Sequence, residues 1–279
     1  MNQQSRVPDP RASILRRTAP GLVGALVLGS LLVAACGPGT VASGVPGSSA
    51  SPTTSAPASP TIAAALQNDF IKVVGSVSPS VVVIETASGL GSGVVFDTNG
   101  DIVTNDHVVA GSTTFSVTLA GGAVLPGTLV GTYPAGDLAV IHVSGTGLKP
   151  ATFGDDTKLV VGDIVLAVGN PLGLQSSVTQ GIVSALGRSV PESSTVTLPN
   201  VIQTSAEINP GNSGGALVDL AGDVVGIPTL AALDPEFGGT PAAGIGFAIP
   251  SSVVVDVAGQ LIASGHAVSA PAPSAQPAT

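Results

Sequence analysis

The stretch Ile208-Asn209-Pro210-Gly211-Asn212-Ser213-Gly214-Gly215-Ala216 sets one serine among glycines, between two apolar, strand-like runs. Glycines allow sharp backbone bends, so neighbouring amide N–H groups can converge on one point. A serine in that setting is a candidate nucleophile, provided that a base lies beside it and donors face the oxyanion that it creates. The same residues also suit an ordinary turn, so the stretch alone leaves both interpretations open.

The composition favours a β-rich globular body. Of the 279 residues 44% are apolar and only 9% are charged, and the chain holds 37 Gly and 23 Pro but no Trp. That balance is typical of short strands joined by glycine turns rather than of long amphipathic helices. Without residues 1–35 the formal net charge is −12, from sixteen acidic and four basic residues. Such an acidic surface argues against nucleic acid and anionic lipid headgroups as partners.

The N-terminus has the pattern of a secretory signal peptide. Arg11, Arg16 and Arg17 precede an apolar run at 21–33, and Val33-Ala34-Ala35-Cys36 closes that run. The closing residues resemble a bacterial lipobox, which implies cleavage before Cys36 and a lipid anchor on that cysteine. An uncleaved signal anchor is an alternative, although the apolar stretch is only marginally long enough to span a bilayer. A soluble secreted product is another, and all three place the body outside the cytoplasm.

The remaining chain divides into a linker, a folded domain and a tail. Residues 36–62 form a Gly/Pro/Ser/Thr linker that cannot bury a core. Residues 63–266 form the domain, and 267–279 are a Pro/Ala tail that we expect to be disordered. Helical spacing at 63–77 predicts a leading helix. Ser251-Ser252 are expected to cap a final helix over 253–262.

Twelve strand patterns fill the domain, separated by turn signals such as Asn99-Gly100 and Gly121-Gly122. They form two groups of six, at about 78–146 and about 150–250. The expected strands are 80–85, 93–96, 101–104, 114–119, 125–130 and 138–143 in the first group, and 163–168, 178–186, 195–203, 215–219, 223–227 and 244–249 in the second. Short strands without intervening helices indicate an all-β fold, either a sandwich or a pair of barrels.

The chain has three histidines that could serve as the base for Ser213. His107 follows a strand pattern, and a histidine at a strand end is presented toward a cleft. His142 lies within a strand and His266 lies near the C-terminus, so His107 is the predicted base.

A third group must orient the histidine and stabilise its charged form. Asp137 opens a wholly apolar strand, and a carboxylate in that position needs a partner. Asp106 is adjacent to His107, but adjacent side chains on a strand point to opposite faces. The predicted order His107, Asp137, Ser213 is the order of the double β-barrel serine proteases.

Five stretches are similar to protease domains of the HtrA/DegP type within the chymotrypsin-like clan. They lie at 91–95, 104–109, 137–140, 169–173 and 209–215. The resemblance covers roughly residues 80–230 and implies two antiparallel six-stranded β-barrels with a short C-terminal helix. It implies that Ser213 is the nucleophile, His107 the base and then the acid, and Asp137 its orienter. Gly211 and Ser213 would supply the oxyanion-hole N–H groups, with Asn212 shaping the turn between them. No metal or cofactor is implied.

The resemblance also bears on partners. It implies an envelope endopeptidase that cuts unfolded or exposed polypeptides. Only about 14 residues follow the last helix pattern, so no PDZ domain is expected there. A homotrimer is implied as well, although Phe70 is the single aromatic residue near the start of the domain. The alternatives are a catalytically idle, chaperone-like or binding lipoprotein on the same scaffold, and a structural β-sandwich with a coincidental motif.

Specificity has two interpretations. By the resemblance, the residue six before the nucleophile, Glu207, lies at the base of the pocket for the side chain before the cut. The family expectation is a small apolar pocket for Val or Ala, whereas a carboxylate there would select Arg or Lys. Alternatively Glu207 faces solvent or pairs with Arg188, and residues near Ile227, Thr229 and Leu230 line the pocket.

Overall fold

The computed structural model describes residues 61–87, 89–170, 177–191, 196–209, 211–234, 240–268 and 270. All of them belong to one compact unit, Pro57–Thr279. The predicted leader at 1–35, Cys36, nearly all of the linker and the tail beyond residue 270 lie outside the described residues. In the part of the chain that the structure describes, no helix combines the length and the apolar character needed to cross a membrane.

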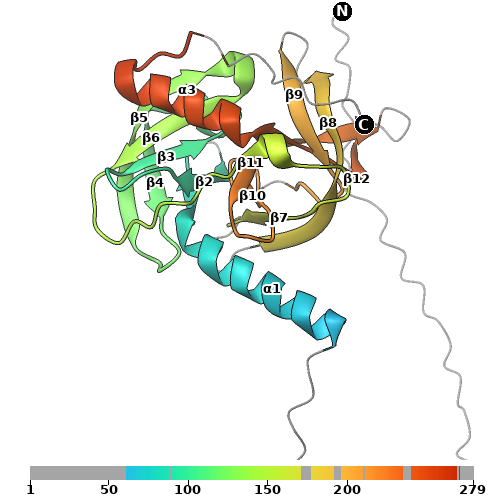
Figure 1. Cartoon of the computed structure of the whole chain (residues 1–279). Helices are drawn as coiled ribbons and strands as arrows, with labels where there is room; N and C mark the ends of the chain where they lie inside the picture. Colours follow the sequence, from blue (N-terminus) through green and yellow to red (C-terminus); the bar gives the residue numbers. More distant parts are fainter. Residues whose placement is uncertain are drawn as a thin grey trace, which may run out of the picture. The chain divides into compact units, whose positions relative to one another are not determined.

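The first six strands close into an antiparallel barrel in the order β1-β2-β3-β6-β5-β4 (Figure 1). The strands are β1 Val81–Glu85, β2 Leu90–Val95, β3 Asp101–Thr104, β4 Thr114–Thr118, β5 Val124–Tyr133 and β6 Leu138–Val143. The predicted turn at Asn99-Gly100 joins β2 to β3. Gly100 has a φ of 111° there, and Asp97 Oδ1 accepts hydrogen bonds from the N–H groups of Asn99 and Gly100.

The last six strands close into a second antiparallel barrel in the order β10-β11-β12-β9-β8-β7. The strands are β7 Ile164–Gly169, β8 Ser177–Pro191, β9 Thr197–Thr204, β10 Ala216–Val218, β11 Val224–Asp234 and β12 Thr240–Pro250. Counted from its own first strand, this barrel has the same connectivity as the first. The all-β double barrel is therefore confirmed, and the glycine-rich stretch around Ser213 lies in the connection from β9 to β10.

Apolar strands bury both of their faces because the barrels pack against each other. In β6, Ala139, Ile141 and Val143 belong to the interior of the first barrel. The alternate residues Leu138 and Val140 join a second cluster shared with barrel two. That shared cluster also takes Leu166, Val168 and Ile227 from barrel two, Val73 and Val77 from helix α1, and Val254, Val257 and Leu261 from helix α3. Residues that immediately precede β6 consequently lie at the junction of the barrels.

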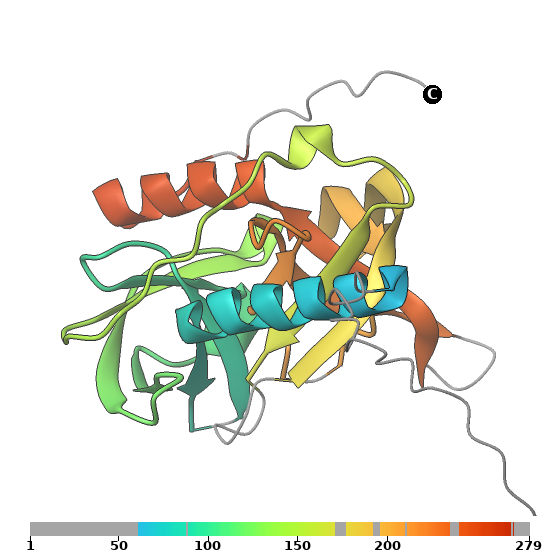
Figure 2. The same ribbon diagram turned by 60° about the horizontal axis from the view of Figure 1, so that its bottom comes forward.

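Two helices flank the barrels. Helix α1, Ile62–Val77, begins at Thr61, whose hydroxyl accepts a hydrogen bond from the Ala64 N–H. Figure 2 shows α1 crossing in front of the barrels. Helix α3, Ser251–Ser264, ends at Gly265 in the left-handed conformation. The short helices are α2 Asp106–Val109, η1 Ser78–Ser80, η2 Pro134–Gly136 and η3 Asp156–Lys158.

The predicted cap of the last helix is wrong in its details. Pro250 occupies the N-cap position of α3, and no side chain of the helix caps it. Instead Asp156, from the segment between the barrels, accepts a hydrogen bond of 2.7 Å from the Ser252 N–H. The Ser251 hydroxyl donates to the Gly154 carbonyl at 2.7 Å. A distant carboxylate therefore does the work that the sequence assigned to local serines, since it can reach a free N–H of the first turn.

Candidate active site

His107 is presented by a short helix that follows β3. Asn105 has extended backbone angles at the start of α2, and His107 is the second residue of that helix. The Asn105 side chain is fully buried, and its Nδ2 donates to the Asp137 carbonyl at 2.9 Å. The His107 side chain keeps 45% exposure. The segment thus holds its histidine against Asp137 on one side and leaves it accessible on the other.

Asp137 is held in a conformation that aspartate seldom adopts. It follows η2 with φ 49° and ψ 45°, the left-handed region, and its N–H donates to the Pro134 carbonyl at 3.2 Å. Its side chain is almost fully buried. Both carboxylate oxygens lie near His107 Nδ1, at 3.0 and 2.9 Å, and Oδ1 also accepts from the His107 main-chain N–H at 3.0 Å. Both oxygens of this buried carboxylate therefore have hydrogen-bond partners.

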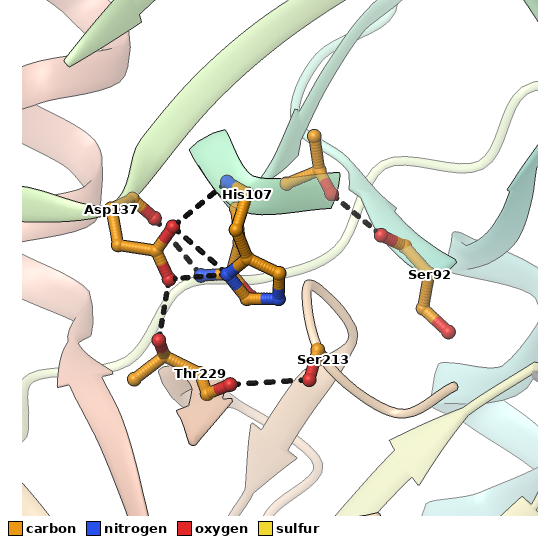
Figure 3. Close-up of polar contacts among 7 residues, drawn as sticks. Ser92, His107, Asp137, Ser213 and Thr229 are labelled. Carbon is orange, nitrogen blue, oxygen red and sulfur yellow. Dashed lines mark hydrogen bonds and ion pairs between the residues drawn. The ribbon is translucent and has the colours of Figure 1, made fainter. Parts of the chain in front are cut away.

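Thr229 joins the carboxylate to the serine. Its hydroxyl donates to Asp137 Oδ2 at 2.5 Å, and its carbonyl accepts from the Ser213 hydroxyl at 3.1 Å. Figure 3 shows Asp137, His107, Thr229 and Ser213 gathered in one place. The sequence placed Thr229 near the substrate pocket and gave no sign of its contact with Asp137. Only the pairing of β11 next to β10 brings it there.

The turn around Ser213 is tied by Asn212. The Asn212 side chain accepts from the Asn209 N–H at 2.9 Å and donates to the Glu207 carbonyl at 3.1 Å. Its own main-chain N–H donates to the Asn209 carbonyl at 3.1 Å. Within the described residues, the N–H groups of Gly211 and Ser213 have no hydrogen-bond acceptor. The two N–H groups predicted as oxyanion donors are therefore the two that the turn leaves unused, and Asn212 shapes the turn.

Gly214 lets this turn approach barrel one. It has a φ of 78°, and a Cβ at that position would overlap the Ser92 carbonyl and the Thr104 hydroxyl. No side chain larger than hydrogen fits between these segments. The glycine after Ser213 is thus required by contact with β2 and β3 as well as by turn geometry.

The other titratable candidates are His142, His266 and Asp106. His142 pairs with Asp101 across neighbouring strands of barrel one, with Nδ1 3.0 Å from Oδ1. His266 follows α3. Asp106 is half-buried, and burial together with the negative charge of Asp137 raises its pKa, against opposing contributions from the Thr132 hydroxyl and His107.

The residues predicted to form the substrate pocket differ in their exposure. The Glu207 side chain is exposed, while its carbonyl accepts hydrogen bonds from the Thr179 hydroxyl and from Asn212 Nδ2. Among the described residues no ion pair joins Glu207 to Arg188. Ile227 is fully buried. Leu230 is described only by its backbone pairing with Phe247, and residues 171–173 of the sequence motif lie outside the described residues.

The part of the chain that the structure describes contains no group of three or more His, Cys, Asp or Glu side chains that could hold a metal ion.

Comparison with known proteins places these residues in context. A family model described as "Trypsin-like peptidase domain" matches residues 91–227. "Serine protease Do-like HtrA" of Lactococcus lactis subsp. cremoris is 42% identical over 217 residues, which cover 74% of this chain and 53% of the relative. A "Probable periplasmic serine endoprotease DegP-like" of Pseudomonas fulva is 46% identical over 179 residues, covering 64% of this chain and 36% of the relative.

The chain is also similar to solved structures of HtrA-type proteases. "HtrA-type protease AlgW with tripeptide" aligns with a TM-score of 0.64 and 40% identity, covering 70% of this chain and 64% of that one. "HtrA-type protease AlgW with decapeptide" aligns with a TM-score of 0.62 and 33% identity, covering 70% and 68%. This chain spans about half the length of the Lactococcus relative.

Proposed function

Because this chain belongs to the HtrA-type, trypsin-like peptidases, we propose that it is a serine endopeptidase acting on unfolded or exposed segments of proteins. One arrangement carries the proposal. The buried carboxylate of Asp137 lies within hydrogen-bond distance of His107 Nδ1, and the nearby turn around Ser213 leaves two main-chain N–H groups without an acceptor among the described residues. Polypeptide substrates agree with the names of the relatives and with the peptide-bound neighbours.

Asp137 prepares the base in this proposal. Its oxygens near Nδ1 keep the Nδ1 proton in place, so the lone pair of neutral His107 lies on Nε2. When His107 becomes charged, the buried carboxylate stabilises the imidazolium. The hydrogen bond from Thr229 to Oδ2 orients the carboxylate in turn.

Ser213 attacks the peptide carbonyl as its proton passes to His107 Nε2. A bond forms between Oγ and the carbonyl carbon, and the oxyanion is stabilised by the N–H groups of Gly211 and Ser213. His107 then gives its proton to the leaving amine as the C–N bond breaks, and water hydrolyses the resulting ester on Ser213. Because a hydroxyl has one proton, Ser213 must turn from the Thr229 carbonyl toward His107 when substrate binds.

The activity can be tested with casein as an unfolded substrate. The purified protein should cleave casein, and Ser213→Ala should abolish cleavage while the protein stays folded, because the change is small and local. Ser264→Ala, which removes an exposed hydroxyl at the end of α3, is the matched control and should cleave at the wild-type rate. Cleavage by Ser213→Ala at the wild-type rate would refute the assignment of the nucleophile, and no cleavage by the wild type would favour an idle binding scaffold.

For specificity we propose a small apolar pocket, since the exposed Glu207 side chain supplies no buried charge to pair with Arg or Lys. A peptide library varied at the residue before the cut should show a preference for Val or Ala in wild type and in Glu207→Ala alike. A preference for Arg that disappears with Glu207 would refute this pocket.

For location we propose an extracytoplasmic protein held at the membrane by lipid on Cys36. The support is the basic, apolar and small-residue order before the cysteine and the periplasmic relatives. Cys36→Ser should release the protein from the membrane or block its maturation, whereas unchanged detergent partitioning with residues 1–35 attached would favour the signal anchor. A homotrimer stays a prediction; within this chain, Phe70 packs against the shared core.

A further inference from the structure

Ser92 is a buried serine in the middle of strand β2 of barrel one, where it pairs with Val83. Its hydroxyl donates to the Gly211 carbonyl at 2.5 Å and accepts from the Asn170 N–H at 2.9 Å. Its main-chain N–H donates to the Ser213 carbonyl at 3.0 Å. Both partners in the turn belong to barrel two, so one residue of barrel one holds the nucleophile turn at two points.

These two points flank the candidate oxyanion donor on Ser213. A peptide unit is planar, so fixing its carbonyl fixes its N–H. The Gly211–Asn212 peptide is held by Ser92 Oγ at its carbonyl and by the Asn209 carbonyl at its N–H. The Ser213–Gly214 peptide is held by the Ser92 N–H at its carbonyl and by the Pro228 carbonyl at its N–H. The Asn212–Ser213 peptide, which carries the Ser213 N–H, lies between two fixed units.

The Ser92 hydroxyl has a defined direction. It carries one proton and two lone pairs. Because the Asn170 N–H occupies one lone pair, and the Gly211 carbonyl can only accept, the proton of Ser92 lies on the bond to Gly211. A variant without the hydroxyl would leave a buried carbonyl and a buried N–H without this partner, which is a costly arrangement that the turn can relieve by rotating.

Ser92 also reaches the segment that leads to His107. Its carbonyl accepts from the Thr104 hydroxyl at 2.7 Å, and Thr104 is the last residue of β3 before Asn105 and α2. The same residue therefore contacts the turn that carries the nucleophile and the strand that leads to the helix of the base.

We propose that Ser92 is a positioning residue of this site: its hydroxyl fixes the Gly211–Asn212 peptide and so keeps the N–H group of Ser213 aimed at the oxyanion. The role rests on the proposed peptidase function. It acts on transition-state stabilisation, because the donors matter most when the oxyanion forms. It does not act on the protonation of His107.

Steady-state kinetics on a short peptide p-nitroanilide, together with the pH profile of kcat/KM, tests this role. Ser92→Ala should lower kcat by about tenfold to a hundredfold, less than the roughly 10²–10³-fold loss on deleting an oxyanion donor outright. KM should stay within about twofold and the pKa of the profile should not move, since uniform binding and the base are intact.

Two further variants distinguish the effect of the hydroxyl from the effect of side-chain shape. Ser92→Thr keeps the hydroxyl and Ser92→Val has the same shape without it, so any crowding by the added methyl group is common to both. The kcat of Ser92→Thr should be at least about fivefold higher than that of Ser92→Val. The pair gives the answer even if Ser92→Ala does not fold.

Ser251→Ala is the matched control, because Ser251 is another buried serine whose hydroxyl donates to a glycine carbonyl, that of Gly154. It should lower the melting temperature and leave kcat unchanged. An unchanged kcat in Ser92→Ala, equal losses in Thr and Val, or an equal loss of kcat in Ser251→Ala would each overturn the role. A wild-type protein that a fluorophosphonate does not label would instead refute the proposed function, and this role with it.

Discussion

Among the described residues, the pairs His107–Asp137 and His142–Asp101 have nearly identical geometry in different surroundings. In both, imidazole Nδ1 lies about 3 Å from a carboxylate oxygen: 2.9 Å in His107–Asp137 and 3.0 Å in His142–Asp101. The imidazoles are similarly exposed, at 45% and 38%, and the carboxylates are similarly buried, at 1% and 9%. Neither the hydrogen bond nor its burial distinguishes a catalytic pair from a structural one.

The surroundings of the two pairs differ. Asp101 and His142 face each other across β3 and β6, both within barrel one. Asp137 lies at the junction of the barrels, where it also accepts from Thr229 of barrel two, whose carbonyl contacts Ser213. The proposed catalytic role of His107–Asp137 rests on this difference, since barrel two brings a hydroxyl and free N–H groups to that pair.

The largest expected effect distinguishes the two carboxylates. Asp137→Asn should lower kcat on the order of 10⁴-fold, because the amide no longer keeps the imidazole in the required tautomer. Asp101→Asn makes the same chemical change in the other pair and should leave kcat within about twofold. Peptidase assays on both variants check this, and a comparable loss in both would refute the distinction between the pairs.

The strand pattern predicted an all-β fold, and the resemblance carried by short local motifs supplied the double barrel. The same motifs predicted His107, Asp137 and Ser213, which the structure gathers in one place. A short, nearly continuous apolar run predicted strand 138–143 to the residue. Long-range contacts were not predictable. Thr229 reaches Asp137 across 92 positions and Ser92 reaches Gly211 across 119, and neither contact has a sequence period or motif.

Strand ends were also less predictable than strand centres. β8 extends to Pro191 and β11 to Asp234, beyond the expected 186 and 227. β11 continues because β12 pairs with it as far as Thr240. Pairing with a partner strand supplies hydrogen bonds to the backbone N–H and C=O groups even where the side chains no longer follow a strand pattern.

A smaller effect should come from the link between the barrels. Thr229→Val keeps the β-branched shape and removes the hydroxyl that donates to Asp137 Oδ2. The carboxylate would be held less firmly, so kcat should fall by roughly tenfold, which corresponds to one hydrogen bond to a charged group. Thr104→Val removes the hydroxyl that donates to Ser92 and is a comparison variant that should not change the pH profile. A Thr229→Val enzyme with wild-type kcat would show that orienting Asp137 does not require this bond.

The smallest expected effect is on the pH dependence of the free energy of unfolding, and it comes from Asp106, the residue before His107. Burial and the charge of Asp137 raise the pKa of Asp106, so its contribution to stability is present below the unfolded pKa of about 3.9 and is lost as pH rises through the higher folded pKa. Asp106→Asn should therefore remove a fall in the free energy of unfolding that begins near pH 4, as measured by urea titration at several pH values.

Asp97 supplies a control of opposite sign for that titration. Although burial opposes it, hydrogen bonds from the Asp101 N–H, the Asn99 side chain and other donors lower the pKa of Asp97. Its stabilisation is present above the unfolded pKa and is lost as pH falls through the folded pKa. Asp97→Asn should thus remove a rise in the free energy of unfolding with increasing pH. If both variants instead removed a fall, the assignment for Asp106 would be contradicted.

The most direct measurement of the central claim is the rate at which a fluorophosphonate labels Ser213 in the wild type, His107→Ala and His142→Ala. If the pair at the barrel junction activates the serine, labelling of the wild type should be rapid and confined to Ser213. His142→Ala should label at a similar rate, and His107→Ala should label at least about 10²-fold more slowly, the size expected for loss of a general base. Labelling of His107→Ala at the wild-type rate, or an equal loss in His142→Ala, would contradict the claim.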